Sequence, residues 1–153
     1  MKPKLLVSAC LLGTPCRYDG KSKKNEAVCA LAERFELIPV CPEVLGGLPT
    51  PRTPSERRGA CVVRKDGRDV TAEYRHGAEC ALETARREGV LAAVLKERSP
   101  SCGSGEIYDG TFTGALTAGD GVTAELLKSN GMTVYGEGEQ SLTEFLCSVS
   151  HST

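Results

Sequence analysis

Cysteine is the residue type whose number and positions most clearly suggest chemistry in this sequence. The chain of 153 residues has eight cysteines, which are Cys10, Cys16, Cys29, Cys41, Cys61, Cys80, Cys102 and Cys147. Disulfide scaffolds are short secreted chains, whereas this chain has enough Leu, Val and Ala to build its own core. In a reducing compartment, grouped cysteines more often bind metal or catalyse a reaction.

The N-terminal segment bears on the compartment. Residues 7–10 resemble the cleavage motif of a lipoprotein signal, but the apolar stretch before Cys10 covers only residues 5–9. A signal sequence needs an apolar region of roughly 7 to 15 residues. No apolar run approaches the roughly 18 residues that cross a bilayer. We therefore expect a cytoplasmic protein with no membrane association.

Three uses of grouped thiolates are open at this point. A structural zinc site normally takes four nitrogen or sulfur ligands, and its usual C-x-x-C pair is absent here. A thiol relay needs two cysteines that can bond to each other, and Cys10 and Cys16 could supply them. An iron-sulfur cluster held by three cysteines keeps one iron open as a Lewis acid, although the compact ferredoxin spacing is also absent.

Composition excludes several classes of partner. Lys and Arg total 19 against 20 for Asp and Glu, which gives a net charge of -1 and a pI near 6.2. Such a chain has no general attraction to nucleic acid or to anionic membranes. Aromatic residues make up 5% of the chain and Trp is absent, so base-stacking platforms are not expected. Recognition of phosphate or carboxylate must be local, and its candidates are Arg17, Arg52, Arg57 and Arg58.

The apolar pattern alternates short buried strands with amphipathic helices. Continuous apolar runs predict strands at residues 5–9, 37–40, 90–95 and 133–135. Helical spacing predicts helices at residues 25–34, 71–88 and 119–130, and a capping box at 141–144 predicts a terminal helix. Turn signals predict two hairpins, one joining 60–64 to 68–70 and one at 109–110. Residues 41–54, with four prolines, are expected to form an irregular functional loop.

These elements predict one α/β domain over residues 1–153. Alternating strands and helices favour right-handed crossovers, and hence a small, doubly wound, Rossmann-like sheet of four mostly parallel strands. We expect the order 2-1-3-4, helices on both faces and one or two short hairpins. In such sheets, ligands bind outside the carboxyl ends of the strands.

This rule brings three distant cysteines together. Cys10 follows the first predicted strand, Cys41 follows the second, and Cys102 lies in the loop after the third. We therefore expect these three thiols to meet at one edge of the sheet. Cys16 lies in the first loop and could face the same crevice. The other four are expected to pack as small apolar side chains, and they are Cys29, Cys61, Cys80 and Cys147.

Polar residues next to these cysteines could take part in a reaction. Glu43 stands two positions after Cys41, within reach of a group bound there, where a buried carboxyl can serve as acid or base. Ser99 and Ser101 stand beside Cys102 and could donate to a bound group or orient a substrate. A solvated loop glutamate and a turn formed by Ser, Pro and Gly are the alternatives at these positions.

Several segments together resemble a known family. They are Ser8-Ala-Cys10-Leu-Leu-Gly13, Cys16-Arg-Tyr-Asp-Gly20, Cys41-Pro-Glu43, Gly46-Gly47-Leu, Pro51-Arg52, and Lys96 through Ser99-Pro-Ser-Cys102-Gly. In this order they resemble the bacterial family that includes the thiouracil desulfidases, over nearly the whole chain to about Glu137. The resemblance implies a 4Fe-4S cluster held by Cys10, Cys41 and Cys102. It also implies Glu43 and Ser99 as catalytic residues, and it assigns no ligand role to Cys16.

The resemblance also implies a reaction. Sulfur would be removed from a thiolated pyrimidine such as 2-thiouracil, 4-thiouracil or a 4-thiouridine mononucleotide, giving the oxo base and hydrogen sulfide without net redox change. An open iron would polarise the carbon-sulfur bond, Glu43 would activate water, and Ser99 would position the base. Ser101, Arg52 and Arg17 are the candidate substrate contacts. With a net charge of -1, a small base or nucleotide is expected rather than a large nucleic acid.

Two other hypotheses come from different classes. The protein could be a metal or sulfur carrier with a regulatory role and no turnover, in which case Glu43→Gln should change nothing. It could also be a thiol oxidoreductase that uses Cys10 and Cys16. In that case, Cys16→Ser should abolish activity and Cys41→Ala should not.

Overall fold

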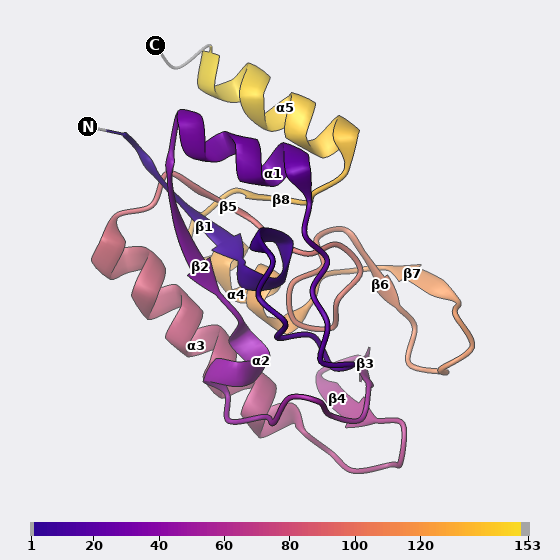
Figure 1. Ribbon diagram of the computed structural model, residues 1–153. Helices are drawn as coiled ribbons and strands as arrows, with labels where there is room; N and C mark the ends of the chain where they lie inside the picture. Colours follow the sequence, from indigo (N-terminus) through magenta and orange to yellow (C-terminus); the bar gives the residue numbers. More distant parts are fainter. Residues whose placement is uncertain (1, 151–153) are drawn as a thin grey trace.

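Four parallel strands form the sheet at the centre of the molecule. In the computed structural model, which describes residues 2–150, their spatial order is β2 (Glu36–Val40), β1 (Lys4–Ser8), β5 (Ala92–Val94) and β8 (Val134–Tyr135). This order matches the predicted 2-1-3-4 (Figure 1). Ser8 pairs with Val40, the last residue of β2, and Val7 pairs with Val94, the last residue of β5. Three strands therefore end nearly level with one another.

Helices cover both faces of the sheet, because β1 is apolar on both sides. Leu5 and Val7 belong to one core with residues of α1 (Glu26–Ala30) and α5 (Glu139–Ser150). Leu6 belongs to a second core with residues of α3 (Thr71–Glu88) and α4 (Val122–Ser129). Figure 1 shows α1 and α5 together at one end of the picture and α3 and α4 across the sheet from them. The predicted doubly wound α/β fold is confirmed.

The longest helix, α3, follows the prediction closely. It spans the predicted residues and ends at Gly89, whose φ of 66° suits a glycine at this position. Its buried face contains Tyr74, Ala78, Ala81, Leu82 and Ala85, which recur at the spacing of one helical face. Within residues 2–150, no helix combines the length and the apolar character needed to cross a bilayer.

Two predictions in the first third of the chain need correction, one of a helix and one of an irregular loop. The predicted helix 25–34 is split into α1 and a short 3-10 helix, η2 (Leu31–Glu33), and Asn25 caps its start by accepting from the Val28 N–H at 3.0 Å. The segment expected to be wholly irregular begins with the short helix α2 (Pro42–Leu45). Proline is favoured in the first turn of a helix, because its missing N–H has no partner to lose there.

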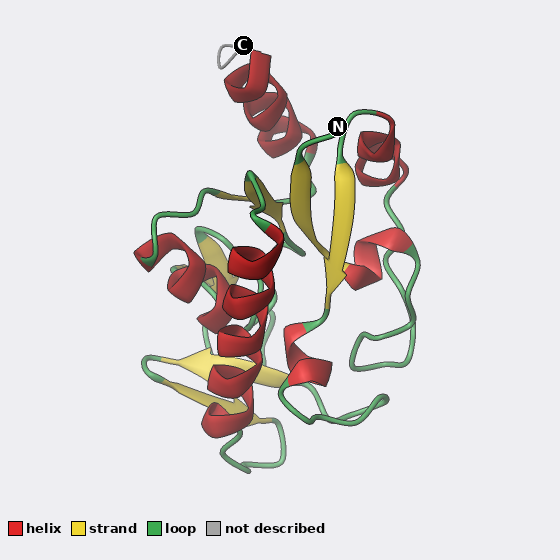
Figure 2. Ribbon diagram, turned by 90° about the vertical axis from the view of Figure 1, so that its left-hand side faces the viewer, coloured by secondary structure: helices red, strands yellow, loops and turns green. Residues whose placement is uncertain are grey.

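The first hairpin also differs from the prediction. The turn at 66–67 exists, with one bridge between Val63 and Asp69, but the ladder of β4 (Cys61–Arg64) is formed with β3 (Ser55–Arg58). Strand β3 carries charged side chains that hydrogen-bond to other loops, so it shows no apolar alternation in the sequence. The second hairpin joins β6 (Glu106–Tyr108) to β7 (Leu116–Ala118) through residues 109–115, a longer connection than predicted. Figure 2 shows the short hairpin strands apart from the central sheet.

The terminal helix begins earlier than the sequence predicts. Helix α5 starts at Glu139, two residues before the expected cap. The Ser141 hydroxyl accepts from the Gly136 N–H at 2.8 Å and is therefore not a helix cap. The Gly136 N–H, in the segment that leaves β8, therefore occupies the hydroxyl that would otherwise cap the helix.

Candidate active site

A cavity of about 510 Å³ lies at the carboxyl ends of the sheet strands. Because β1 and β2 end in register, the short 3-10 helix η1 (Ala9–Leu12) and helix α2 begin beside each other. The loop that follows β5 supplies a third side of the cavity. Its volume falls within the range of small-molecule sites, roughly 300 to 1,000 Å³.

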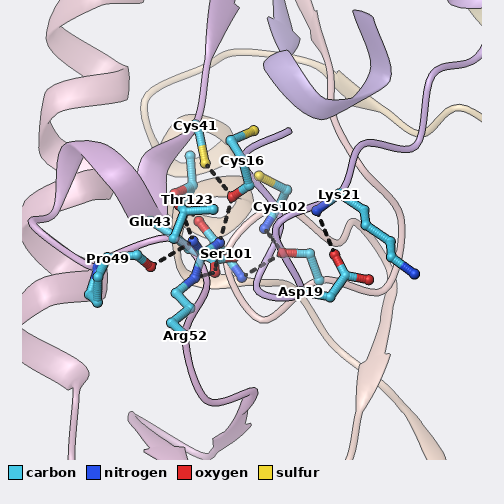
Figure 3. A network of polar contacts seen from close by, with 12 residues as sticks. Cys16, Asp19, Lys21, Cys41, Glu43, Pro49, Arg52, Ser101, Cys102 and Thr123 are labelled. Carbon is cyan, nitrogen blue, oxygen red and sulfur yellow. Dashed lines mark hydrogen bonds and ion pairs between the residues drawn. The ribbon is translucent and has the colours of Figure 1, made fainter. Parts of the chain in front are cut away.

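Four cysteines line this cavity, and they include the three that the sequence predicts there. Cys10, Cys41 and Cys102 come from three different strand ends, and Cys16 comes from the loop after η1. Cys10, Cys16 and Cys102 are buried, and Cys41 is partly buried. In Figure 3 the sulfur atoms of Cys16, Cys41 and Cys102 lie in one small region beside a network of polar contacts.

The other four cysteines lie outside the cavity, and the prediction that they are buried is wrong for two of them. Cys61 and Cys147 are exposed, whereas Cys29 and Cys80 are partly buried. In strand β4 the side chains alternate, so burial of Val62 turns its neighbour Cys61 outward. Cys147 lies on the outer face of α5, away from the buried Leu142 and Phe145.

Hydrogen bonds between thiols, together with burial, raise the pKa of three cavity cysteines. The pKa of Cys16 is raised, chiefly by its hydrogen bond with Cys10, and that of Cys41 is raised chiefly by its hydrogen bond with Cys16. Burial raises the pKa of Cys102 to about 12, although the hydroxyls of Ser8 and Ser101 oppose the shift. A cation bound among these thiols would favour their ionised form.

The loop that carries Cys102 is fixed by Ser99 and by the start of α4. The Ser99 hydroxyl accepts from the backbone N–H groups of Ser101 and Cys102, each at 3.1 Å. The first N–H groups of α4 donate to the carbonyls of Pro100 and Ser101. A side chain at Gly121 would lie 2.4 Å from the Ser101 backbone, so only glycine permits this contact. Ser99 faces the cavity, and its hydroxyl hydrogen remains available for a ligand.

Ser101 does not line the cavity. It is fully buried, and its hydroxyl lies 2.8 Å from the Thr123 hydroxyl of α4. The same side chain lies within hydrogen-bonding reach of the Cys102 thiol. This position gives no support to the prediction that Ser101 binds substrate, because the loop turns its side chain toward α4.

Direct backbone contact between α2 and α3 sets the position of Glu43. An added Cβ at Gly77 would lie 1.8 Å from the Pro42 carbonyl, and one at Gly46 would lie 2.1 Å from the Glu73 carbonyl. The two helices therefore touch through glycines on both sides. This contact holds Glu43 at the cavity, close to the buried Tyr74 of α3.

Glu43 forms an ion pair with Arg52 that is almost hidden from solvent. Arg52 Nη2 and Nε lie 2.7 and 2.9 Å from the same Glu43 oxygen, Oε2. The remaining contacts of Arg52 are to backbone carbonyls of Cys16 and Pro49 and to the Thr50 hydroxyl, at 3.0 to 3.2 Å. Figure 3 shows Arg52 between Glu43, Cys16 and Pro49.

The charge balance around Arg52 follows from this geometry. Burial works to lower the pKa of the Arg52 guanidinium, but the charge and hydrogen bonds of Glu43 outweigh it and raise that pKa. Burial and the charge of Glu43 also raise the pKa of Tyr74. The helical spacing of Tyr74 indicates only a core position, although a buried tyrosine hydroxyl usually needs a polar partner and could have indicated one.

The remaining predicted arginines divide into two groups. Arg17 lines the cavity, pairs with Asp19 at 3.5 Å and lies over the Tyr18 ring. Arg57 and Arg58 lie on β3 and do not line the cavity, because they reach toward Asp120 and Gly110 instead. Their positions give no support to the expectation that these two recognise an anion in the cavity.

Sequence reasoning missed several other cavity residues. Tyr18 and Tyr108 line the cavity with exposed rings, and Lys23, Lys96 and Arg98 add positive charge. Tyr108 lies on β6, outside every cysteine motif in the sequence, so no local signal identifies it. These five residues add aromatic and cationic groups to a lining that also contains Glu56 and Glu97.

Within residues 2–150, no group of three or more His, Cys, Asp or Glu side chains is arranged to hold one metal ion. Four sulfur ligands of one zinc would each stand about 2.3 Å from the metal. The described residues therefore hold no preformed four-ligand zinc site.

Comparison with known proteins gives consistent matches over this chain. The family described as 2-thiouracil desulfurase matches residues 5–139. The chain is 44% identical over 145 residues to the uncharacterized protein YbbK of Bacillus subtilis (strain 168), covering 88% of this chain and 96% of YbbK. It is also similar to the solved structure of the 4Fe-4S-dependent thiouracil desulfidase TudS, with 50% identity and a TM-score of 0.90. That match covers 97% of this chain and 99% of the TudS chain.

Proposed function

The chain belongs to the 2-thiouracil desulfurase family, and on that basis we propose that it replaces the sulfur of a thiolated pyrimidine with oxygen from water. One observation carries the proposal: three cysteines from separate strand ends line one cavity with Glu43 and Ser99. The reaction consumes water and a C=S group and yields a C=O group and hydrogen sulfide. Its atoms balance with no oxidant or reductant, so the cleavage is hydrolytic.

We assign a 4Fe-4S cluster as the cofactor, with Cys10, Cys41 and Cys102 as its ligands. The cavity residues fit this group, because thiolates are the usual ligands of iron-sulfur clusters and Cys10, Cys41 and Cys102 all line one cavity. When bound through three cysteines, the cluster supplies an open iron that acts as a Lewis acid toward the thiocarbonyl sulfur. Reduced cysteines of this kind suit the cytoplasm, where we place the enzyme.

Glu43 is the general base in this proposal. It lines the cavity, and its Oε2 is occupied by Arg52, so Oε1 lies outside the ion pair. That oxygen takes a proton from the water as the water attacks the ring carbon, and it returns the proton to the departing sulfide. Burial of the pair keeps bulk water from competing with the carboxylate.

Ser99 positions the pyrimidine. Its oxygen already accepts from two backbone N–H groups, which fixes the direction of the hydroxyl. The hydroxyl hydrogen is then donated to a carbonyl or a ring nitrogen of the base.

The lining of the cavity favours a nucleotide over a free base. Tyr18 and Tyr108 offer ring faces for stacking, and Arg17, Lys23 and Arg98 offer charge for a phosphate. We therefore rank 4-thiouridine monophosphate above 2-thiouracil and 4-thiouracil as substrate. Arg17→Ala should raise KM for the nucleotide by about 10-fold and leave KM for 2-thiouracil unchanged. An equal effect on both substrates would contradict the phosphate assignment.

The test of the proposed function begins with anaerobic purification. We expect about four irons and four acid-labile sulfides per chain, and sulfide release from at least one of the three thiolated pyrimidines. Cys41→Ala should abolish both, while Cys16→Ser should retain iron. Full iron content without sulfide release would favour a carrier. Loss of activity in Cys16→Ser with normal activity in Cys41→Ala would favour the thiol relay.

A further inference from the structure

Arg52 is a buried arginine at the cavity whose donors all reach groups of the protein itself. Its side chain is 7% exposed, and a guanidinium has five N–H donors in a fixed plane. Two donors reach Glu43, one reaches the Cys16 carbonyl, and two reach Pro49 and Thr50. A substrate phosphate would need a donor that is not already engaged. The geometry therefore does not support the sequence prediction that Arg52 binds substrate.

The contacts of Arg52 join the segments that surround Glu43. The guanidinium connects α2 to the loop of Cys16, and the Arg52 backbone N–H donates to the Tyr18 carbonyl at 2.7 Å. Glu43 stands in the first turn of a four-residue helix, and its carboxylate also lies within hydrogen-bonding reach of the Tyr74 hydroxyl. Two charge-assisted hydrogen bonds to Oε2 hold that oxygen in place and leave Oε1 outside the ion pair.

We propose that Arg52 is a positioning residue, which holds Glu43 by Oε2 so that Oε1 points at the attacking water. This inference rests on the proposed function, because it acts through Glu43 as the base. A substrate contact and a positioning residue differ in kinetics. Loss of uniform substrate binding raises KM, whereas loss of an aligned base lowers kcat.

Arg52→Lys is the main variant, because lysine keeps the charge but cannot make the paired contacts of the guanidinium. We expect kcat to fall by roughly 10- to 100-fold with KM unchanged, the usual size of such supporting effects. Arg57→Lys is the matched control, since Arg57 is also shielded and paired but lies outside the cavity. A rise in KM for 4-thiouridine monophosphate with unchanged kcat would overturn the proposal.

A double variant tests whether Arg52 acts through Glu43. In a Glu43→Gln background, Arg52→Lys should lower kcat by less than about twofold further, since coupled residues are not additive. If the fold-decrease in kcat of the double variant equals the product of the fold-decreases of the two single variants, the two residues act independently and the proposal is overturned. The urea midpoints of wild type, the two single variants and the double variant give a readout independent of activity. Arg52→Lys should lower the midpoint less in the Glu43→Gln background than in the wild type.

A milder variant covers the case in which Arg52→Lys does not fold. Thr50 is exposed and accepts from Arg52 Nη1 at 3.1 Å, so Thr50→Val loosens the arginine without disturbing the core. We expect kcat to fall by about 2- to 5-fold, the value of one neutral hydrogen bond, with normal iron content. A wild-type protein with full iron and no sulfide release would refute the proposed function itself. An active wild type with unchanged kcat in Arg52→Lys and Thr50→Val would refute only the role of Arg52.

Discussion

The four cysteines of the cavity and the four outside it show how different settings change one residue type. The cavity cysteines come from loops that follow parallel strands, and three of the four are buried. The outer cysteines lie within helices or on a hairpin, and two of them are exposed. The two groups therefore differ in their place in the fold, because only the cavity cysteines follow the ends of sheet strands. Substitutions at the cavity should therefore have much larger effects than substitutions outside it.

The largest effect is expected for Cys102→Ala. It removes one of the three proposed ligands, so iron per chain and sulfide release should both fall. We expect activity to drop by more than about 100-fold, since changes beyond the ligands already cost 10- to 100-fold. Cys147→Ala in α5 is the control and should match wild type in iron content and rate. Full iron content in Cys102→Ala would show that this cavity cysteine is not a ligand and would contradict the proposed distinction between the two groups of cysteines.

Glu43→Gln should come next in size. It preserves shape and removes the basic oxygen, so kcat should fall by about 100- to 10,000-fold while iron content stays normal. The measurement is sulfide release at saturating substrate, with iron determined on the same sample. Glu83→Gln is the control, because Glu83 is an exposed glutamate of α3 outside the cavity. Equal rates for the two variants would argue against general base catalysis and in favour of a carrier.

Gly77→Ala tests how α3 positions the cavity residues. In an ordinary helix this change stabilises by about 1 kcal/mol, but here the new Cβ would lie 1.8 Å from the Pro42 carbonyl. We expect overpacking to lower the free energy of unfolding by about 2 kcal/mol, measured by urea denaturation. Displacement of α2 should also reduce kcat. Glu79→Ala on the exposed face of α3 should stay within about 0.5 kcal/mol of wild type. A stabilised Gly77→Ala would show that α2 can move away freely.

The smallest effect is expected for Cys61→Ser on the outer hairpin. Cys61 is exposed and does not line the cavity, so stability should change by less than about 0.5 kcal/mol. Rate and iron content should equal those of wild type. The measurement is thermal unfolding together with sulfide release. A clear loss of iron would place Cys61 in the chemistry and contradict the division between the two groups.

Some of the candidate site can be predicted from the amino-acid sequence alone. Apolar runs identify the strands that precede Cys10 and Cys41, and the parallel order then places both at one edge. The motif around Cys102 marks the third loop. Such predictions succeed because the position of a residue just after a strand is local information, and parallel strands point the same way.

Other parts cannot be predicted in this way, since they depend on contacts between distant segments. Strand β3 is too charged to show alternation, and its side chains bind Asp120, Glu125 and Gly110. By sequence, Arg52 resembles an exposed anion contact in a proline-rich loop, yet Glu43 and Cys16 engage it. Tyr108 reaches the cavity only because a separate hairpin folds over it.

The α/β class, the strand order and the meeting of Cys10, Cys41 and Cys102 follow from the sequence, because periodicity and chain direction are local properties. Which polar groups face the cavity and which face the protein depends on tertiary packing. That packing turns Ser101 toward Thr123 and engages every donor of Arg52. A side chain's partners are set by the segments that pack around it, and those segments come from far along the chain.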